Sequence, residues 1–200
     1  MKTLVFASRN RGKMVEVEHI LNSLLGQDGV KLLNLDDIGY IGEIEETGQT
    51  FEENALAKAK MAYLKSGIPS FADDSGLEVD ALRGEPGIYS ARYAFLNGKG
   101  KEGDSQANMD CLLKKMETIE NRSAVFICCI GYVGEEQYIV RGECRGEILR
   151  YPRGDSGFGY DPLFYVPSCG KTFSQLPRDV KNAISHRGNA LQLFARRLKQ

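Results

Sequence analysis

The chain has 200 residues, of which 42% are hydrophobic and 26% are charged, and its formal net charge is -1. This composition is typical of a soluble globular protein with one sizeable core. The nearly neutral charge disfavours a nucleic-acid-binding role and general attraction to an anionic membrane, so any phosphate ligand has to be bound by local positive charge.

The five cysteines are scattered and include no C-x-x-C pair, which argues against a disulfide framework and against a zinc site. The chain opens directly with a strand pattern and lacks the charged and apolar regions of a signal peptide. No apolar run approaches the roughly 18 residues of a membrane-spanning helix. We therefore expect a cytoplasmic protein with no membrane partner.

The first predicted element is a buried strand at residues 3–7, because this run is continuously apolar. A polar segment follows it, made of Ser8, Arg9, Asn10, Arg11, Gly12 and Lys13. A helix is predicted next from apolar residues at helical spacing: Val17, Ile20, Leu21 and Leu24. A loop that enters a helix N-terminus exposes backbone N–H groups that suit a phosphate. The alternative is a solvated basic loop in which Asn10 or Ser8 caps the helix.

A second strand is predicted at residues 31–35, and an acidic, glycine-containing loop follows at residues 42–48. Thr50 and Glu53 have the spacing of a capping box at the start of a second helix. The apolar face of that helix is formed by Phe51, Ala55, Ala59 and Ala62. Lys58 and Lys60 belong to its solvated face, unless one of them reaches a bound phosphate.

Two adjacent carboxylates follow an apolar strand in the stretch from Phe71 to Gly76. Acids at the end of a strand lie where α/β sheets open into ligand crevices. Because extended residues alternate between faces, Asp73 and Asp74 cannot both reach one ion unless the chain turns between them. We expect one of them to be chemical and the other structural. The alternative is an Asp-Asp-Ser-Gly turn, since these residues dominate turns.

The middle of the chain is rich in predicted strands. A glycine-rich mobile loop at residues 97–104 precedes an amphipathic helix at residues 105–116. A hairpin is predicted from residues 123–133 and 137–142, and a further strand from residues 144–149. Strands set between helix-bearing ends indicate an α/β fold in which helices flank a mixed central sheet, with two lobes.

A long loop at residues 151–161 ends in Phe158, Gly159, Tyr160 and Asp161. Glycines that separate two aromatic residues and a carboxylate let the backbone approach a flat ligand closely. The alternative is a turn whose aromatic side chains pack into the core. A final helix is predicted from the apolar face of Ile184, Leu191, Phe194 and Leu198, with residues 181–187 at its entry.

Five segments in this order resemble the motifs of the inosine triphosphate pyrophosphatase family, also called XTP/dITP diphosphatases. They are Ser8-x-Asn10-x-x-Lys13, Ala72-Asp73-Asp74-Ser75-Gly76-Leu77, residues 86–94 (Pro-Gly-Ile-Tyr-Ser-Ala-Arg-Tyr-Ala), residues 158–162 (Phe-Gly-Tyr-Asp-Pro), and Lys181-Asn182-x-Ile184-Ser185-His186-Arg187. The resemblance covers nearly the whole chain.

The resemblance implies a single domain of residues 1–200, with two lobes and an active-site cleft between them. It implies a cytoplasmic homodimer that uses Mg²⁺ to hydrolyse ITP, dITP and XTP to the monophosphate and pyrophosphate. By matching position, Asp74 would be the catalytic proton acceptor and a Mg²⁺ ligand. Glu45 would be the second magnesium carboxylate, with the adjacent Glu46 as the alternative.

The resemblance also implies the substrate contacts. The segment Ser8 to Lys13 would bind the triphosphate, and Ser75 would contact the substrate. The base pocket would be formed by Phe158, Gly159, Tyr160 and Asp161. Its closing wall would be formed by Lys181, His186 and Arg187. The alternative for His186 is a helix-entry residue that is hydrogen-bonded locally.

This chain departs from the family pattern near the proposed base-binding wall. Gln175 and Val180 stand where the family usually has acids, so any charge pairing that those acids provide is in doubt. The residues assigned to the metal and to the phosphates are intact.

The residues fit a preference for 6-keto purines. Such a base presents an acceptor at position 6 and a donor at N1, whereas adenine presents the reverse. Arg187 and backbone amides only donate, and an ionised Asp161 only accepts, so adenine would leave them unpaired. Two other readings are a Maf-like pyrophosphatase of pyrimidine triphosphates and a non-catalytic nucleotide-binding regulator.

Overall fold

The computed structural model describes residues 2–26, 29–42 and 44–200. The helices are α1 (Arg11–Leu25), α2 (Phe51–Ser66), α3 (Tyr93–Leu96), α4 (Ser105–Lys115), α5 (Arg178–Ile184) and α6 (His186–Leu198). The strands are β1 (Lys2–Phe6), β2 (Val30–Leu33), β3 (Ser70–Val79), β4 (Ser123–Val133), β5 (Gln137–Ile148), β6 (Phe164–Val166) and β7 (Lys171–Thr172). The 3-10 helices are η1 (Asp80–Leu82), η2 (Gly87–Arg92), η3 (Pro167–Cys169) and η4 (Phe173–Gln175).

The described strands form one sheet of seven, in the order β2-β1-β3-β4-β5-β6-β7. β1 is parallel to both β2 and β3, whereas β6 is antiparallel to β5 and β7. The predicted mixed sheet flanked by helices is therefore confirmed.

The chain divides into two compact units, as the predicted two lobes require. Unit 1 contains Met1–Asp74, Cys128–Gly142 and His186–Gln200, and unit 2 contains Ser75–Ile127 and Glu143–Ser185. The strands β3, β4 and β5 each contribute residues to both units. The buried apolar side chains form separate clusters within each unit, so each unit has a core of its own.

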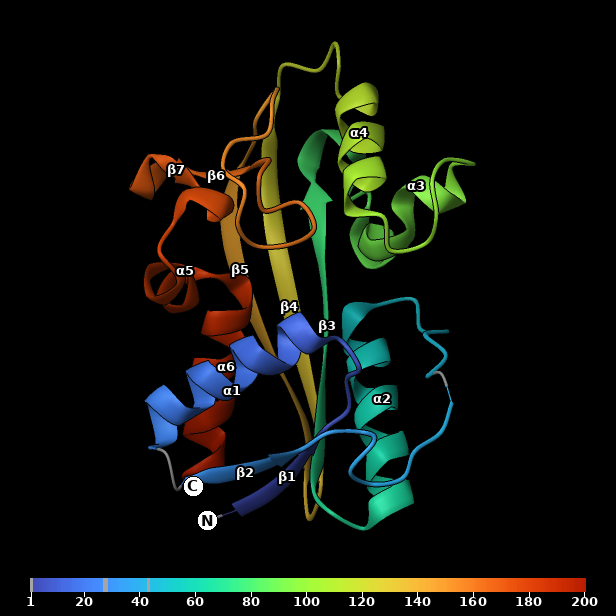
Figure 1. Cartoon of the computed structure of the whole chain (residues 1–200), viewed down its shortest axis with the longest axis vertical. Coiled ribbons are helices and arrows are strands. Elements are labelled where there is room, and N and C mark those ends of the chain that lie inside the picture. Colours follow the sequence, from blue (N-terminus) through green and yellow to red (C-terminus); the bar gives the residue numbers. More distant parts are fainter. Residues whose placement is uncertain (1, 27–28, 43) are drawn as a thin grey trace. The chain divides into compact units, whose positions relative to one another are not determined.

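In unit 1, β1 is buried on both faces, as its continuous apolar run predicts. Leu4 and Phe6 belong to the cluster that packs against α1 and α6. Val5 and Ala7 point the other way and belong to the cluster that packs against α2. Figure 1 shows α1 and α6 on one side of these strands and α2 on the other. Side chains of β1 and its neighbour β3 therefore meet different helices on their two faces.

The two helix starts predicted in unit 1 are confirmed. The Asn10 side chain caps α1 by accepting a hydrogen bond from the Lys13 amide. The Thr50 hydroxyl caps α2 by accepting from the Glu53 amide, while the Glu53 carboxylate accepts from the Gln49 amide. The predicted apolar face of α2 is fully buried, because its alanines fit closely against the sheet.

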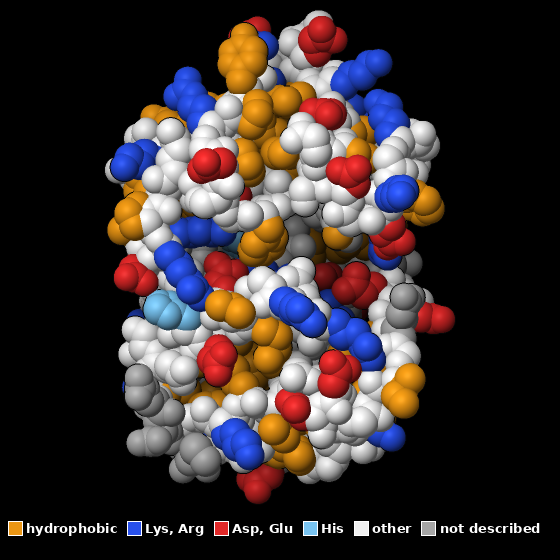
Figure 2. Space-filling view, in the orientation of Figure 1, with side chains coloured by type: hydrophobic (Ala, Val, Ile, Leu, Met, Phe, Trp, Pro, Cys, Tyr) orange, Lys and Arg blue, Asp and Glu red, His pale blue; other side chains and the backbone are white. Residues whose placement is uncertain are grey.

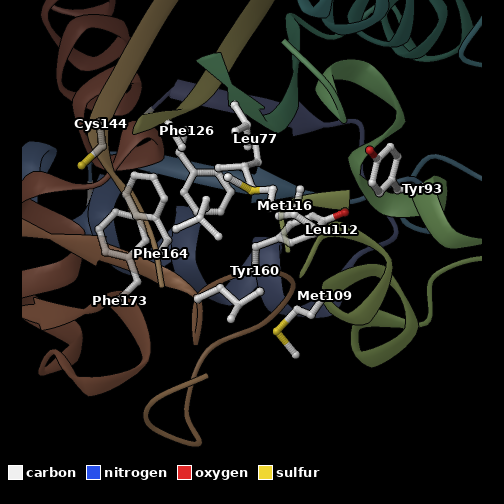
Figure 3. Close-up of a cluster of buried hydrophobic side chains, with 14 of the residues drawn as sticks. Leu77, Tyr93, Met109, Leu112, Met116, Phe126, Cys144, Tyr160, Phe164 and Phe173 are labelled. Carbon is white, nitrogen blue, oxygen red and sulfur yellow. The ribbon is translucent and has the colours of Figure 1, made fainter. Parts of the chain in front are cut away.

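The core of unit 2 is aromatic (Figure 3). The rings of Phe126, Phe164 and Phe173 pack together, with centroids 4.6 to 5.7 Å apart. Leu112 of α4 and Leu77 of β3 are fully buried in the same cluster. This cluster supports the segments on both sides of the loop at residues 151–161.

The alternative of an Asp-Asp-Ser-Gly turn is wrong, because β3 continues through this segment to Val79. Asp73 and Asp74 are both buried in the strand. Cationic and amide side chains from helices on the two faces of β3 contact these carboxylates, and those contacts outweigh the local turn preference of the segment.

The predicted break between strands near residue 143 is also wrong, because β5 is continuous from Gln137 to Ile148. Gly142 lies within it, and a Cβ at this position would overlap the backbone of His186 and Ala190. The glycine therefore does not end the strand. It allows α6 to pack closely against it.

The predicted final helix is two helices. Ser185 has an extended backbone, and it separates α5 from α6. Ile184 thus ends α5, while Leu191, Phe194 and Leu198 form the buried face of α6 as predicted.

None of the described helices is both long and apolar enough to cross a bilayer. On the face drawn in Figure 2, acidic and basic side chains are interspersed over the described surface. This mixture agrees with the nearly neutral net charge.

Candidate active site

Strand β3 presents two adjacent carboxylates to opposite faces of the sheet in unit 1. Asp73 contacts Lys13 of α1 and Arg187 of α6. Asp74 contacts side chains of α2 instead. The alternation follows from the period of two in an extended strand. The prediction that these two residues cannot act on one ion, and so have separate roles, agrees with this geometry.

The Asp73 side chain lies in a buried network of four charges. The Lys13 Nζ lies 3.1 Å from Asp73 Oδ2, and Arg187 donates to the same oxygen from Nε (3.2 Å) and Nη2 (3.0 Å). The Arg187 Nη1 also donates to Glu16 Oε2 at 2.5 Å. The network contains two acids and two bases, so its formal charges balance.

Burial and charge act in opposite directions on this network. Burial alone would raise the pKa of Asp73, but the charges of Lys13 and Arg187 outweigh it and hold that pKa well below its usual range. Burial alone would lower the pKa of Arg187, but Asp73 and Glu16 raise it. Both groups therefore stay charged, and Asp73 is a fixed anion rather than a proton acceptor.

Asp74 lies in a different environment on the α2 face. The Asn54 Nδ2 donates to Asp74 Oδ2 at 3.0 Å, and the Lys58 Nζ lies 3.5 Å from Asp74 Oδ1. The same ammonium donates to Glu46 Oε1 at 2.6 Å. Burial raises the pKa of Asp74, and the nearby Glu46 carboxylate raises it further, against the opposing effect of Lys58. Asp74 is therefore better suited than Asp73 to accept a proton.

The α2 face also suits a small divalent cation. Among the residues that the structure describes, no group of three His, Cys, Asp or Glu residues is arranged to hold a metal. Mg²⁺, however, takes one or two protein carboxylates and completes its shell with phosphate oxygens and water. Asp74 and Glu46 provide two hard oxygen donors that flank one ammonium group, so the residues present fit Mg²⁺.

The two neighbouring glutamates differ in their surroundings. Glu46 is partly buried and contacts Lys58, whereas Glu45 is exposed. The prediction that Glu45 binds the metal stays a prediction. In the structure, the carboxylate of the alternative residue, Glu46, contacts the same cation as Asp74.

The predicted phosphate-binding segment forms the turn and first helical residues between β1 and α1. Asn10 caps the helix, and its own amide donates to Ser8 Oγ at 3.2 Å. Arg11, Gly12 and Lys13 form the first turn of α1 rather than a loop. The Arg9 guanidinium donates to the Tyr40 carbonyl at 2.7 Å. In this structure Arg9 therefore anchors the segment to the turn after β2.

A second group of predicted residues lies within unit 2. The Asp161 carboxylate is buried, and its Oδ2 accepts from Lys181 Nζ at 2.7 Å and from the Phe158 amide at 2.9 Å. The Lys181 Nζ also lies 5.1 Å from the centre of the Phe158 ring. Phe158 itself is 43% exposed. These contacts bring three predicted residues together around one ion pair.

Two glycines shape this loop, and one of them is required by a close contact. Gly157 has a φ of 85°, and a Cβ there would overlap the Asp161 carboxylate. Gly159 has a φ of 63° with open space around it. The backbone therefore wraps closely around Asp161, while the predicted close approach to a flat ligand stays a prediction.

The remaining predicted residues differ in exposure. Tyr160 is buried, and its hydroxyl donates to the Ser90 carbonyl at 2.9 Å, so it anchors the loop in the core of unit 2. Ser75 is partly buried, directly after Asp74 on β3. His186 is buried at the start of α6 and belongs to unit 1, as does Arg187, whereas Lys181 belongs to unit 2.

The two departures from the family pattern have local explanations. The Gln175 side chain accepts from the Thr172 amide and completes a capping box at η4. Val180 is 42% exposed on α5. Lys181 pairs with Asp161, and neither replacement takes part in that pair.

Sequence reasoning missed two residues of the charged clusters, Glu16 and Asn54. Glu16 lies three residues after Lys13 on α1, and Asn54 lies four residues before Lys58 on α2. Residues at these spacings share one face of a helix, so each missed residue could have been found from its predicted neighbour.

Comparisons with known proteins agree over nearly the full chain. A model of the Ham1 family matches residues 4–197. A dITP/XTP pyrophosphatase of Geobacter sulfurreducens is 48% identical over 198 residues, which cover 97% of this chain and 95% of that protein. A protein of the same name from Mycolicibacterium paratuberculosis is 47% identical over 199 residues, covering 97% of this chain and 94% of the relative.

Solved structures agree with these relatives. The Ham1 protein of Staphylococcus aureus superposes with a TM-score of 0.86 at 41% identity, covering 99% of this chain and 98% of its own. A HAM1 protein from Coxiella burnetii gives a TM-score of 0.88 at 40% identity, covering 100% of this chain and 99% of its own.

Proposed function

This chain belongs to the Ham1 family, and from that membership we propose that it hydrolyses the non-standard purine nucleotides ITP, dITP and XTP to the monophosphate and pyrophosphate. It is then a hydrolase acting on acid anhydrides, and its role is to cleanse the nucleotide pool. One observation carries the proposal: Asp74, a buried carboxylate with a raised pKa, lies beside Lys58 and Glu46 on the α2 face of β3.

Asp74 is proposed as a ligand of Mg²⁺, together with a carboxylate from Glu45 or Glu46. When bound, Mg²⁺ neutralises phosphate charge and makes nearby water more acidic. Resemblance favours Glu45 for the second carboxylate, and the contact with Lys58 favours Glu46.

The residues of unit 1 supply charge and a proton acceptor for the hydrolysis. The Ser8–Lys13 segment offers helix N–H groups and basic side chains to the triphosphate. Lys13 is held by Asp73, and it stabilises the charge that builds up on the departing pyrophosphate. Asp74 orients the attacking water and takes its proton. Attack at the α-phosphate is proposed from the family resemblance.

The residues of unit 2 supply the chemistry of base recognition. The Lys181 ammonium donates hydrogen bonds, and Asp161 holds it in place through an ion pair. The exposed ring of Phe158 offers a flat surface for a purine. A 6-keto base presents an acceptor to such donors, whereas adenine would leave them unpaired. In this structure Arg187 is engaged by Glu16 and Asp73, and its contact with the base stays a proposal.

The assembly and location are proposed on the family resemblance alone. We propose one domain of residues 1–200 that forms a homodimer in the cytoplasm, where its nucleotide substrates are made and used. Light scattering after size-exclusion chromatography checks the dimer, and a mass of one chain contradicts it.

The function is tested by measuring pyrophosphate and orthophosphate released from ITP, XTP, GTP, ATP and dTTP, each with Mg²⁺ and with EDTA. We expect pyrophosphate from ITP and XTP only, no turnover in EDTA, and a raised KM for ITP in Lys181→Met. Release of orthophosphate contradicts attack at the α-phosphate. A preference for dTTP contradicts the base assignment and favours a Maf-like activity, and the absence of turnover favours a nucleotide-binding regulator.

A further inference from the structure

Lys58 lies in the middle of a helix, and its side chain is buried although a lysine carries a charge. Its side chain lies between the Glu46 carboxylate, 2.6 Å from Nζ, and the Asp74 carboxylate, 3.5 Å away. Lys60, two residues further along α2, is exposed instead. The two carboxylates that contact this ammonium offset the cost of burying its charge. A positive charge thus lies between the two carboxylates that fit Mg²⁺.

We propose that Lys58 is a resident cation that competes with Mg²⁺ for Glu46 and Asp74 and weakens metal binding to the nucleotide-free enzyme. This inference rests on the metal site proposed above. An ammonium and a divalent ion attract the same carboxylate oxygens, and each raises the free energy of placing the other nearby. With Lys58 between them the two carboxylates carry a net charge of -1, and without it they carry -2.

The lysine is built to leave these carboxylates when a nucleotide binds. Its ammonium ends a flexible four-carbon chain and donates in several directions, so it can turn from Glu46 to a phosphate oxygen without a change in α2. The Asn54 amide holds the other oxygen of Asp74, so this carboxylate keeps its orientation when Lys58 moves. Metal and nucleotide binding are then coupled, and each strengthens the other by the same factor.

A purely structural ion pair makes a different prediction. In that case Lys58 only stabilises the fold, and its loss leaves the metal affinity of the folded enzyme unchanged or lower. Metal affinity in the absence of nucleotide therefore separates the two roles, which turnover alone does not.

The experiment measures binding of Mn²⁺ alone to nucleotide-free protein at about pH 8, where model carboxylates are ionised. Free Mn²⁺ is quantified by electron paramagnetic resonance for the unmodified chain, Lys58→Met, Lys58→Gln and the matched control Lys60→Met. We expect both Lys58 variants to bind Mn²⁺ at least about tenfold more tightly, which corresponds to about 1.4 kcal/mol of binding free energy. Lys60→Met should bind like the unmodified chain.

Two further measurements test where the ion binds and whether it stabilises the folded chain. Adding Asp74→Asn to Lys58→Met should abolish the gain, which locates the ion at Asp74. Thermal unfolding with and without Mn²⁺ should show a larger metal-dependent rise in Tm for the Lys58 variants than for Lys60→Met, even where they are less stable without metal.

Equal or weaker Mn²⁺ binding in both Lys58 variants overturns the inference, and so does a gain that survives Asp74→Asn. If that happens while turnover of the unmodified chain still requires Mg²⁺, the proposed function stands and only the role of Lys58 fails. If turnover does not require a divalent metal, the proposed metal site fails as well.

Discussion

The two faces of β3 in unit 1 carry similar side chains but differ in charge balance. On the face of α1 and α6, the acids Glu16 and Asp73 meet the bases Lys13 and Arg187, so the named charges cancel. On the face of α2, Lys58 contacts both of the acids Glu46 and Asp74. The named charges there leave one negative charge in excess.

The difference in charge balance separates a structural carboxylate, Asp73, from a chemical one, Asp74. In a balanced network each buried charge has its partner, and the pKa of Asp73 is lowered. In the unbalanced cluster, burial raises the pKa of Asp74 and the nearby Glu46 carboxylate raises it further. Such a site gains most from an added cation or proton, which is the chemistry that hydrolysis of a phosphoanhydride needs.

Removing the charge of Asp74 should change activity more than any other substitution of this site. We expect Asp74→Asn to lower kcat for ITP by about 10² to 10⁴, the range for loss of a positioned acid or base. The free energy of unfolding should change little, because burial and the nearby Glu46 carboxylate oppose the stabilising contacts of Lys58 and Asn54 with Asp74. Steady-state kinetics and urea unfolding of the same preparation check both expectations.

Asp73→Asn is the matched variant on the other face. It leaves Arg187 and Lys13 without their shared carboxylate, so we expect a loss of about 3 to 5 kcal/mol in the free energy of unfolding. Two results together would reverse the assignment of the two faces. One is an Asp73 variant that keeps full stability but loses all turnover, and the other is an Asp74→Asn variant that stays active.

The next effect tests whether the balanced face is structural. Arg187→Met removes the cation shared by Asp73 and Glu16, and should lower the free energy of unfolding by about 3 to 5 kcal/mol. Arg196→Met, on an exposed position of the same helix, should stay within about 0.5 kcal/mol of the unmodified chain. Urea unfolding without nucleotide measures both. Equal stability of the two variants would show that the Arg187 network does not hold α6 in place.

Local sequence patterns predict the elements of this fold better than they predict the partners of its charges. The strand β1 and the caps at Asn10 and Thr50 are confirmed, because apolar runs and helix caps act over a few residues. The alternative of a turn at Asp73 fails for the same reason: the local residue preference favours a turn, and contacts from distant helices decide otherwise.

The balanced network shows why the rest could not be predicted from local patterns. Arg187 and Glu16 are 171 positions apart, and no periodicity relates them. The family resemblance assigns Arg187 to the base, while its contacts in this structure are with two acids of unit 1. Gly142 likewise predicts a break in a strand, whereas in the structure it allows α6 to pack closely against the strand. Both depend on packing between elements that are distant in sequence.

The smallest expected effect comes from the two helix caps, one on each face of β3. Asn10→Ala and Thr50→Ala each remove a side-chain acceptor from a helix N-terminus, which costs about 1 kcal/mol of stability. Their effects on catalysis should differ, because Asn10 belongs to the segment proposed to bind phosphates and Thr50 does not. We expect a raised KM for ITP in Asn10→Ala and an unchanged KM in Thr50→Ala, at matched losses of stability. An equal rise in both would mean that KM follows stability alone, and the phosphate role of the Ser8–Lys13 segment would then lose its support.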